Sequence, residues 1–413
     1  MNRRHFLKQS ALTTAGTMLI PHFLKAYEAH AFGQPVKPSN GKILVVVQLS
    51  GGNDGLNTVV PYRNDIYYRE RPTIAIPSEK VLPLTDDIGL HPAMEPLRTL
   101  YDDGLLTVIN NVGYPNPDRS HFRSMDIWQT ASDADTYLNT GWVGRYLDAA
   151  CAGQAAQPFR TVEVDDTLSL ALKGHDLNGL AVLDPKKFYN QTRSGLVSDL
   201  SRNYKPAGGE EHEPVAYLYK TLAQTVSSAA YVYEKTGRNG GLIASTVTYP
   251  NHELGNRLRT VSQLIQSGVE TSVYYVSISG FDTHINQPGQ QARLLGQYAE
   301  AVGAFMADLK AAGRLDDVLL MTFSEFGRRV KQNASNGTDH GTANNVFLIG
   351  GGLGRRDGPG QVLNEAPDLT NLTDGDLTYS VDFRRIYATL LRDYLGADDR
   401  AILGRKFEPL KLV

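Results

Sequence analysis

The chain has 413 residues, of which 41% are hydrophobic and 21% charged, and this is the composition of a globular protein with one large or two ordinary domains. The formal net charge of −3, without any block of like charge, argues against nucleic-acid binding. Cys151 is the single cysteine, which excludes an intrachain disulfide. Stability must therefore come from a packed core and from any bound metal.

The N-terminus has the features of an export signal. Arg3 and Arg4 precede a mildly apolar stretch, residues 11–24, that is too short for a stable membrane span. An A-x-A sequence ending at Ala31 predicts cleavage there, and the paired arginines resemble a twin-arginine signal. We expect residues 1–31 to direct the protein through the twin-arginine translocase to the periplasm or the medium.

The remaining chain is expected to be one domain. Residues 32–41 read as a linker and residues 42–413 as a single α/β domain, with the less regular stretch 165–250 as a surface insertion. Removing residues 1–31, which carry four basic groups and one acidic group, changes the net charge from −3 to −6. The mature protein is thus acidic, and we expect no polybasic or other stable membrane anchor.

Apolar, β-branched runs alternate with helical patterns along this domain. Their nearly continuous apolar character predicts strands that are covered on both faces. The predicted strands are Ile43–Leu49, Leu105–Val112, Phe159–Val164, Ser272–Ser277, Val318–Phe323 and Val346–Ile349. The predicted helices are Pro92–Asp102, Ser120–Thr130, Pro214–Glu234, Glu253–Ser267, Gln290–Ala311 and Asp382–Leu395. The pattern predicts a doubly wound, mostly parallel sheet with helices on both faces.

Unusual polar sequences adjoin five of these strands. They are S-G-G-N-D-G after the first, N-P-D-R-S-H-F after the second, S-G-F-D-T-H after the fourth, S-E-F-G-R-R after the fifth and T-D-H-G-T-A before the sixth. Ligands of open α/β sheets bind beyond the carboxyl ends of the strands. We therefore expect these five segments to meet in one crevice.

The five segments supply both carboxylates and imidazoles. This mixture suits Zn, Mn or Fe, whereas a set of oxygen ligands alone would indicate Mg or Ca. The sequence therefore predicts a divalent metal, with Zn preferred. The predicted ligands are Asp54, Asp282, His284, Glu325, Asp339 and His340.

Ser120 is a predicted nucleophile. A serine at a helix N-terminus meets unpaired backbone N–H groups that favour an anion, and a nearby metal would activate its hydroxyl. Arg119 and Arg328 are predicted to bind the anionic group of a substrate. Each of these residues has a plainer interpretation, as an ordinary helix cap or a surface charge.

The same motifs resemble the DUF1501 family of secreted bacterial proteins of unassigned activity. The resemblance rests on V-V-V-Q-L-S-G-G-N-D-G-L-N-T, R-S-H-F-R-S, G-F-D-T-H and the pair S-E-F-G-R and D-H-G-T-A, and it extends from about Lys42 to the C-terminus. That family is in turn similar to the alkaline phosphatase and sulfatase superfamily. This more distant resemblance implies an alkaline phosphatase-like fold and a metal-assisted attack on a phosphate or sulfate ester.

The superfamily resemblance also implies roles for individual residues. It implies that Asp54, Asp282, His284, Glu325 and His340 bind one or two metals and that Ser120 is the nucleophile. The sequence departs from the superfamily at Glu325-Phe326, where an Asp-His pair is expected. Asp339 and His121 are available to replace the missing imidazole.

The sequence therefore predicts an exported metal-dependent hydrolase of a small anionic ester or glycan. Two alternatives stay open. One is a metal-free serine esterase with Ser50 as nucleophile and Asp339-His340 as its partners, although no G-x-S-x-G elbow supports it. The other is a non-catalytic envelope protein that uses the crevice to bind a glycan or a protein.

Overall fold

The computed structural model describes residues 40–195, 197, 213–237, 243–353 and 358–412. The predicted signal peptide, residues 1–31, and most of the predicted linker lie outside these residues. Within the described part of the chain, no helix has both the length and the apolar content that crossing a bilayer requires.

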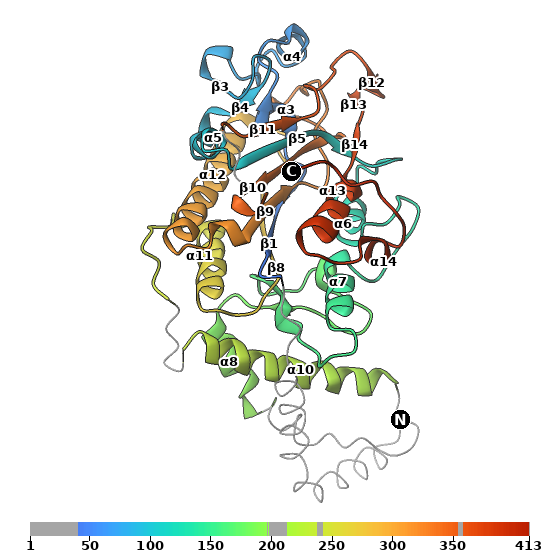
Figure 1. Cartoon of the computed structure of the whole chain (residues 1–413). Coiled ribbons are helices and arrows are strands. Elements are labelled where there is room, and N and C mark those ends of the chain that lie inside the picture. The colour runs from blue at the N-terminus through green and yellow to red at the C-terminus, as the bar shows by residue number, and fades with distance from the viewer. Residues whose placement is uncertain (1–39, 196, 198–212, 238–242, 354–357, 413) are drawn as a thin grey trace, which may run out of the picture.

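A nine-stranded sheet forms the centre of the molecule (Figure 1). Its order is β11-β5-β10-β9-β1-β8-β6-β7, and β14 also pairs with β5. The strands are β1 (Ile43–Ser50), β5 (Leu106–Gly113), β6 (Thr161–Glu163), β7 (Leu180–Ala181), β8 (Val273–Ser279), β9 (Val318–Phe323), β10 (Asn344–Ile349), β11 (Gln361–Leu363) and β14 (Val381–Asp382). All six predicted strands are present, and β7, β11 and β14 are additional.

The sheet is mostly parallel, as predicted. β1 pairs in parallel with β8 and β9, and β6 does so with β7 and β8. β10 is antiparallel to both β9 and β5, so it runs against its neighbours. Because β10 is reversed, its first residues lie at the edge where β9, β1 and β8 end.

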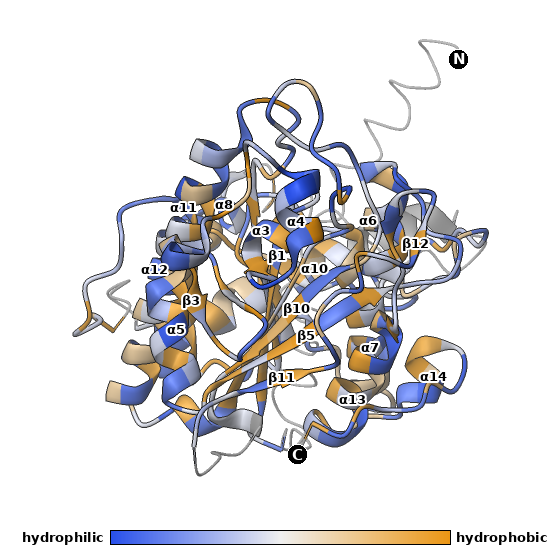
Figure 2. Cartoon of the chain, turned by 90° about the horizontal axis from the view of Figure 1, so that it is seen from above, coloured by the Kyte–Doolittle hydropathy of each residue, from blue (hydrophilic) through white to orange (hydrophobic). Residues whose placement is uncertain are grey.

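Helices cover both faces of the sheet. One face packs on α5 (Glu95–Asp102), α11 (Glu253–Gln266) and α12 (Gln287–Ala311), and the other on α6 (His121–Thr130), α7 (Trp142–Ala150), α13 (Phe383–Thr389), the π-helical turn Leu390–Tyr394 and α14 (Asp399–Leu403). Apolar residues concentrate on the strands between these layers (Figure 2). In β1, Val45 and Val47 belong to the first core, and Leu44 and Val46 to the second. Alternate residues thus meet different cores, which explains why the strand is apolar throughout.

The remaining elements lie around this framework. They are α3 (Gly55–Thr58), β2 (Val59–Val60), α4 (Asp65–Glu70), β3 (Leu82–Pro83), β4 (Gly89–Leu90), α8 (Pro185–Thr192), α10 (Glu213–Lys235) and the hairpin of β12 (Leu372–Thr373) and β13 (Asp376–Leu377). Short 3-10 turns complete the chain, among them Pro92–Met94 before α5. Residues 165–250 contribute the edge strand β7 to the main sheet, so part of the predicted insertion is sheet; the domain boundaries stay a prediction.

Glu163, at the end of β6, makes stability depend on pH. Its side chain is buried, and burial raises the pKa of its carboxyl to about 7. Because the pKa is higher in the folded than in the unfolded chain, the stabilisation is present at acid pH and is lost as the pH rises through about 7. Titration of Glu163 should lower the unfolding free energy of the wild type by about 2 to 3 kcal/mol between about pH 5 and pH 8. We expect the Glu163→Gln variant not to show this decrease.

Urea unfolding of the wild type and the variant at these two pH values measures this effect. Glu270→Gln, at an exposed glutamate, is the matched control and should keep the wild-type pH dependence. Identical pH dependence of the Glu163→Gln variant and the wild type would contradict the assignment.

Candidate metal centre

The five predicted polar segments meet at one edge of the sheet. Asn344, at the start of β10, pairs with Val112 near the end of β5. The loops after β1, β5, β8 and β9 therefore adjoin the loop that precedes β10. This convergence was predicted from the strand ends and is confirmed by the sheet topology.

The glycines after β1 allow three of these loops to touch. Gly51 has φ +118°, and a Cβ atom there would lie 2.5 Å from the backbone nitrogen of Asp282. Gly52 has φ +72°, and a Cβ atom there would lie 2.2 Å from the ring of Phe326. The S-G-G turn is thus required by the close approach of the β8 and β9 loops.

Asp54, a predicted metal ligand, lies in a buried ion pair. Its carboxylate is 0% exposed, and Oδ2 accepts hydrogen bonds from Arg71, at 2.6 Å from Nη1, and from Gln287. The Oε1 atom of Gln287 accepts in turn from the hydroxyls of Thr283 and Thr338. Asp54 is therefore connected through Gln287 to the segments that carry Asp282 and Asp339. Its carboxylate forms no hydrogen bond or ion pair with any of the described histidines, so it lies apart from the other predicted metal ligands.

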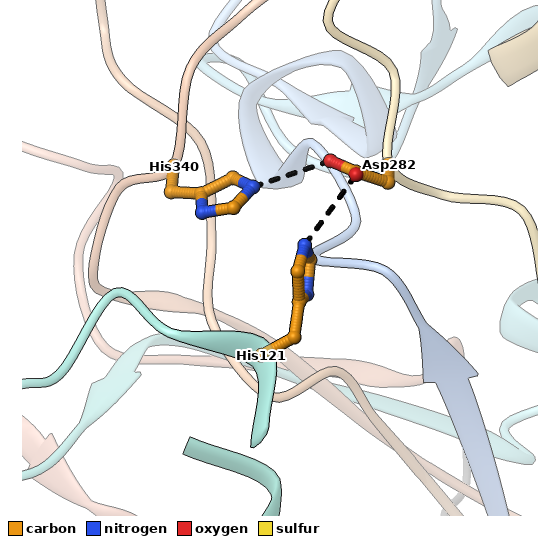
Figure 3. Close-up of side chains that lie close together, drawn as sticks. All are labelled: His121, Asp282 and His340. Carbon is orange, nitrogen blue, oxygen red and sulfur yellow. Dashed lines mark hydrogen bonds and ion pairs between the residues drawn. The ribbon is translucent and has the colours of Figure 1, made fainter. Parts of the chain in front are cut away.

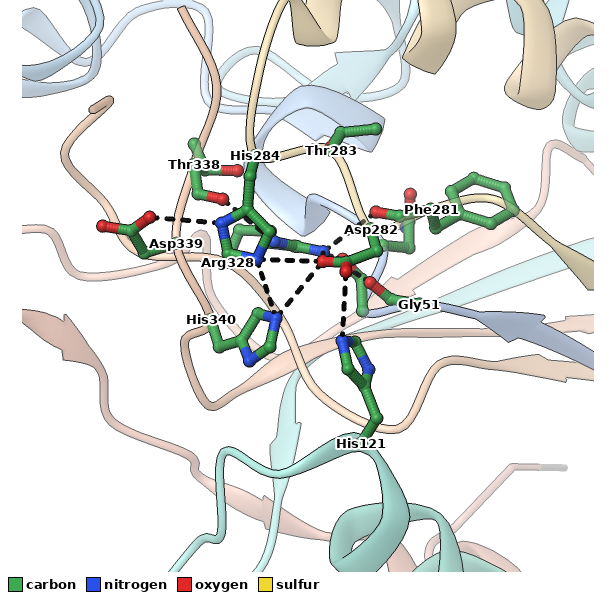
Figure 4. A network of polar contacts seen from close by, with 12 residues as sticks. Gly51, His121, Phe281, Asp282, Thr283, His284, Arg328, Thr338, Asp339 and His340 are labelled. Carbon is green, nitrogen blue, oxygen red and sulfur yellow. Dashed lines mark hydrogen bonds and ion pairs between the residues drawn. The ribbon is translucent and has the colours of Figure 1, made fainter. Parts of the chain in front are cut away.

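Three donor atoms meet beside the β8 loop (Figure 4). The Nε2 atoms of His284 and His340 lie 3.0 Å apart, and they are 3.0 and 3.2 Å from Oδ1 of Asp282, respectively. The side chains of Asp282 and His284 are 48% and 40% exposed, so the cluster is open to solvent. A ligand can reach it without a change in the fold.

His121 adds a third imidazole (Figure 3). It is the first residue of α6, and its Nε2 lies 3.5 Å from Oδ2 of Asp282 without any hydrogen-bond partner. Among the described residues, His121, Asp282 and His340 form the group whose donor atoms lie close enough together to share one cation. From the sequence, His121 was named only as a replacement for the imidazole missing at Phe326. Its position directly after the predicted nucleophile Ser120 could have indicated that it belongs to the site.

Each imidazole is held through its other nitrogen. Nδ1 of His121 faces Glu325 at 3.0 Å, and Nδ1 of His284 faces Asp339 at 3.2 Å. Nδ1 of His340 lies 2.8 Å from the carbonyl oxygen of Arg119. These partners accept hydrogen bonds, so each Nδ1 carries the proton and each Nε2 presents a lone pair.

This arrangement fits a metal ion. Lone pairs on two Nε2 atoms and a carboxylate oxygen about 3 Å apart repel one another unless a cation or a proton lies between them. Tetrahedral zinc with Zn–N distances of about 2.0–2.1 Å sets its ligand atoms about 3.3 Å apart. Carboxylates or carbonyls behind the ligating imidazoles are usual at such sites. Glu325 and Asp339, predicted as direct ligands, occupy these outer positions.

Phe326 stands where an imidazole was expected. Its buried ring lies 4.8 Å from the ring of His121 and 4.7 Å from that of His340, measured between centroids. It packs against both imidazoles, whose own ring centroids lie 4.4 Å apart. His121 thus supplies a third imidazole from a different element.

Arg328 is buried and does not face the crevice as a free cation. Its guanidinium donates to the carbonyls of Gly51, Gly52, Phe281 and Thr338, and to Oδ1 of Asp282 at 2.7 Å. Burial opposes ionisation of Asp282, but Arg328 and the neighbouring imidazoles outweigh it and hold the pKa of Asp282 at about 2. Arg328 therefore positions an ionised Asp282, in place of the predicted contact with substrate.

The surroundings set opposite pKa shifts on two imidazoles. The hydrogen bond to Glu325 raises the pKa of His121, whereas burial lowers the pKa of His340. A neutral His340 keeps its Nε2 lone pair available for a cation.

The predicted nucleophile lies directly beside the cluster in sequence. Ser120 is exposed at the N-cap of α6, where its side chain makes no capping hydrogen bond. Arg119 is half-exposed and pairs with the buried Asp376. The serine esterase alternative requires Asp339 and His340 to act as a pair beside Ser50. They do not form this pair, because Asp339 contacts His284 while Nδ1 of His340 contacts the Arg119 carbonyl.

Comparison with solved structures finds matches that are 10 to 14% identical to this chain. A protein in the alkaline phosphatase superfamily from Vibrio parahaemolyticus is 10% identical, with 94% of this chain and 77% of that chain covered and a TM-score of 0.39. The PsFucS1 sulfatase from Pseudoalteromonas sp. is 14% identical, with 95% and 74% covered and a TM-score of 0.37. The zinc complex of the C-terminal periplasmic domain of EptC from Escherichia coli is 12% identical, with 76% and 74% covered and a TM-score of 0.36.

All three TM-scores lie below 0.5, so these likenesses give no conclusion about the function of this chain. The chemistry of the site depends on its own residues. A search of curated proteins found no match. The family model described as a protein of unknown function, DUF1501, matches residues 41–406, and the chain therefore belongs to the DUF1501 family.

Proposed function

We propose that this protein is an exported, metal-dependent hydrolase of phosphate or sulfate esters. One observation carries the proposal: the Nε2 atoms of His121, His284 and His340 converge on the carboxylate of Asp282 at a solvent-open strand edge. Each of these imidazoles is held at Nδ1 by an acceptor, which prepares it to bind a cation rather than to shuttle protons.

His121, Asp282 and His340 would hold one divalent cation, and His284 adjoins them through its contacts with Asp282 and His340. A mixture of imidazoles and one carboxylate favours Zn, with Mn and Fe next, over Mg or Ca. A bound cation would supply Lewis acidity to an anionic ester group and to the hydroxyl that attacks it.

The N-terminus of α6 would bind the anionic part of the ester. The helix is 10 residues long, and its first N–H groups lack intrahelical acceptors, so they favour an anion beside Ser120. The guanidinium of Arg119 is paired with Asp376, so the helix N–H groups and the cation would provide the positive potential for the anion. Ser120 would attack phosphorus or sulfur, the bond to the alcohol oxygen would break, and water would later release the anion from the serine.

The test is an ester screen on the purified, metal-loaded protein. We expect hydrolysis of 4-nitrophenyl phosphate or sulfate that stops on chelation and returns with Zn, Mn or Fe. Asp282→Asn and Ser120→Ala should each lower kcat by about 10³-fold or more, since they remove a metal ligand and the nucleophile. Ser194→Ala, at an exposed serine after α8, is the matched control.

A protein that binds metal but hydrolyses no phosphate, sulfate or phosphonate ester would contradict the proposal. That result would favour the non-catalytic envelope protein. Hydrolysis that survives chelation and is lost in Ser50→Ala would favour the serine esterase.

Export through the twin-arginine translocase rests on Arg3, Arg4 and the apolar stretch that follows them. This route carries folded proteins with their cofactors already bound, which suits a metal centre assembled from loops far apart in sequence. The substrate we propose is a small anionic ester or an esterified glycan.

A further inference from the structure

A cavity of about 570 Å³ adjoins the metal centre. Its walls come from the loop after β5, residues 113–119, and from the β12–β13 hairpin and the residues after it, 373–379. Small-molecule sites commonly have volumes of about 300–1,000 Å³, so this cavity is large enough for one or two sugar rings. None of the predicted metal ligands lines it.

Two residues connect the cavity to the cluster. Phe326 lines the cavity and also packs against the rings of His121 and His340. Arg119 lines it too, and its carbonyl oxygen holds Nδ1 of His340. A group in the cavity is therefore next to the cation site, where the alcohol part of an ester would extend.

The charges around the cavity largely cancel. The guanidinium of Arg119 is bound to the buried carboxylate of Asp376, which also lies 3.8 Å from Arg329. Asp374 is the acidic residue of the lining. A second anionic group on the substrate, as in a nucleotide, would find no uncompensated cation among these residues, so the occupant is uncharged.

The rest of the lining offers hydroxyls, an amide and aromatic rings. Thr373 and Thr378 are exposed, and their hydroxyls lie 3.1 Å apart. Asn116 is exposed between two prolines, which restrict the backbone of this rim. These groups can exchange hydrogen bonds with the hydroxyls of a ligand, while Pro115, Pro117 and Leu377 add apolar surface to the lining.

Tyr379 gives the cavity a half-buried aromatic wall. A Cβ atom on Gly113 would lie 2.8 Å from Cβ of Tyr379, so the tyrosine packs directly against the end of β5. This contact holds the base of the tyrosine side chain against the strand. An aromatic ring next to hydroxyl and amide groups matches a sugar, which has an apolar face and a polar edge.

We propose that this cavity binds an uncharged sugar ring, which is the alcohol part of the ester that the metal centre cleaves. The assignment as an alcohol site rests on the proposed function. Binding of a neutral sugar does not depend on it, because the cavity lining is separate from the metal ligands.

Saturation-transfer NMR on the metal-free protein with neutral methyl hexosides tests this proposal. We expect saturation transfer to the sugar protons for at least one methyl hexoside. Tyr379→Ala and Asn116→Ala should each weaken binding, roughly tenfold in Kd for the tyrosine, since a loss of about 1.4 kcal/mol changes Kd tenfold. Tyr137→Ala, at an exposed tyrosine outside the cavity lining, should bind like the wild type.

Two results would overturn the inference. One is the absence of transfer to every methyl hexoside, or transfer that is equal in the wild type and both cavity variants. The other is transfer to octanol but not to the sugars, which would identify a lipid site. Because the probes are neutral and the protein is metal-free, failure here is distinguishable from failure of the ester screen.

Discussion

We expect the wild-type protein, purified without chelator, to retain about one equivalent of Zn, Mn or Fe, and the His340→Ala and His284→Ala variants each to lose it. Each substitution removes one of the three imidazoles that surround Asp282, and we expect the affinity to fall by more than about 100-fold. Glu325→Gln leaves the imidazole of His121 in place but weakens its support, and it should lower the affinity about 10- to 100-fold. Elemental mass spectrometry and competition with a chromogenic chelator measure both effects.

The control for this experiment is His175→Ala, at an exposed histidine far from the cluster in sequence. It should retain the wild-type metal content. A wild-type protein that takes up no metal even after soaking would rule out the hydrolase mechanism and favour an envelope binding protein. Equal metal content in all the histidine variants would place the metal elsewhere.

We expect Arg71→Met to destabilise the protein by about 3 to 5 kcal/mol, because it leaves the buried carboxylate of Asp54 without its counter-charge. Both side chains of this pair are 0% exposed. The Arg71 guanidinium also donates to Asn57 and to the carbonyls of Arg329 and Val330, so the substitution additionally frees several buried acceptors. Urea unfolding followed by circular dichroism measures the change in unfolding free energy.

Arg69→Met is the matched control, since Arg69 lies on the same helix, α4, with a largely exposed side chain. It should change the stability by less than about 0.5 kcal/mol. Adding Asp54→Asn to Arg71→Met should recover part of the loss, because the unpaired charge is then removed. If Asp54→Asn instead abolished metal binding in a stable protein, Asp54 would be a metal ligand and its structural role would be wrong.

The order of strands and helices was largely predictable. Val45 and Val47 face one core and Leu44 and Val46 the other, and this double burial makes β1 an unbroken apolar run that can be recognised from residue types alone. The long helices were recognised for a related reason, since a helix that covers a sheet needs one apolar face. The short strands β7, β11 and β14 were missed, because two or three residues leave no periodic pattern.

The position of the site at one edge of the sheet could also be predicted from the sequence. Each polar segment adjoins a strand, and parallel strands bring their carboxyl ends to one edge. Asp282, His284 and His340 were predicted in this way, and they lie together. The glycines at 51 and 52 accommodate the close approach of the β8 and β9 loops, which residue type alone does not reveal.

Only the tertiary structure determined which side chain each of these carboxylates contacts. Asp54, Glu325 and Asp339 are alike in sequence as acids near strand ends, yet they contact Arg71, His121 and His284, respectively. The direction of a side chain in a loop depends on backbone dihedrals and on segments distant in sequence, and residue type records neither. Glu325 and His121 are 204 positions apart, and the reversed β10 that carries the His340 loop to them left no sign in the apolar pattern. The sequence by itself thus determined the types of donor and the edge where they meet, whereas long-range packing determined their geometry.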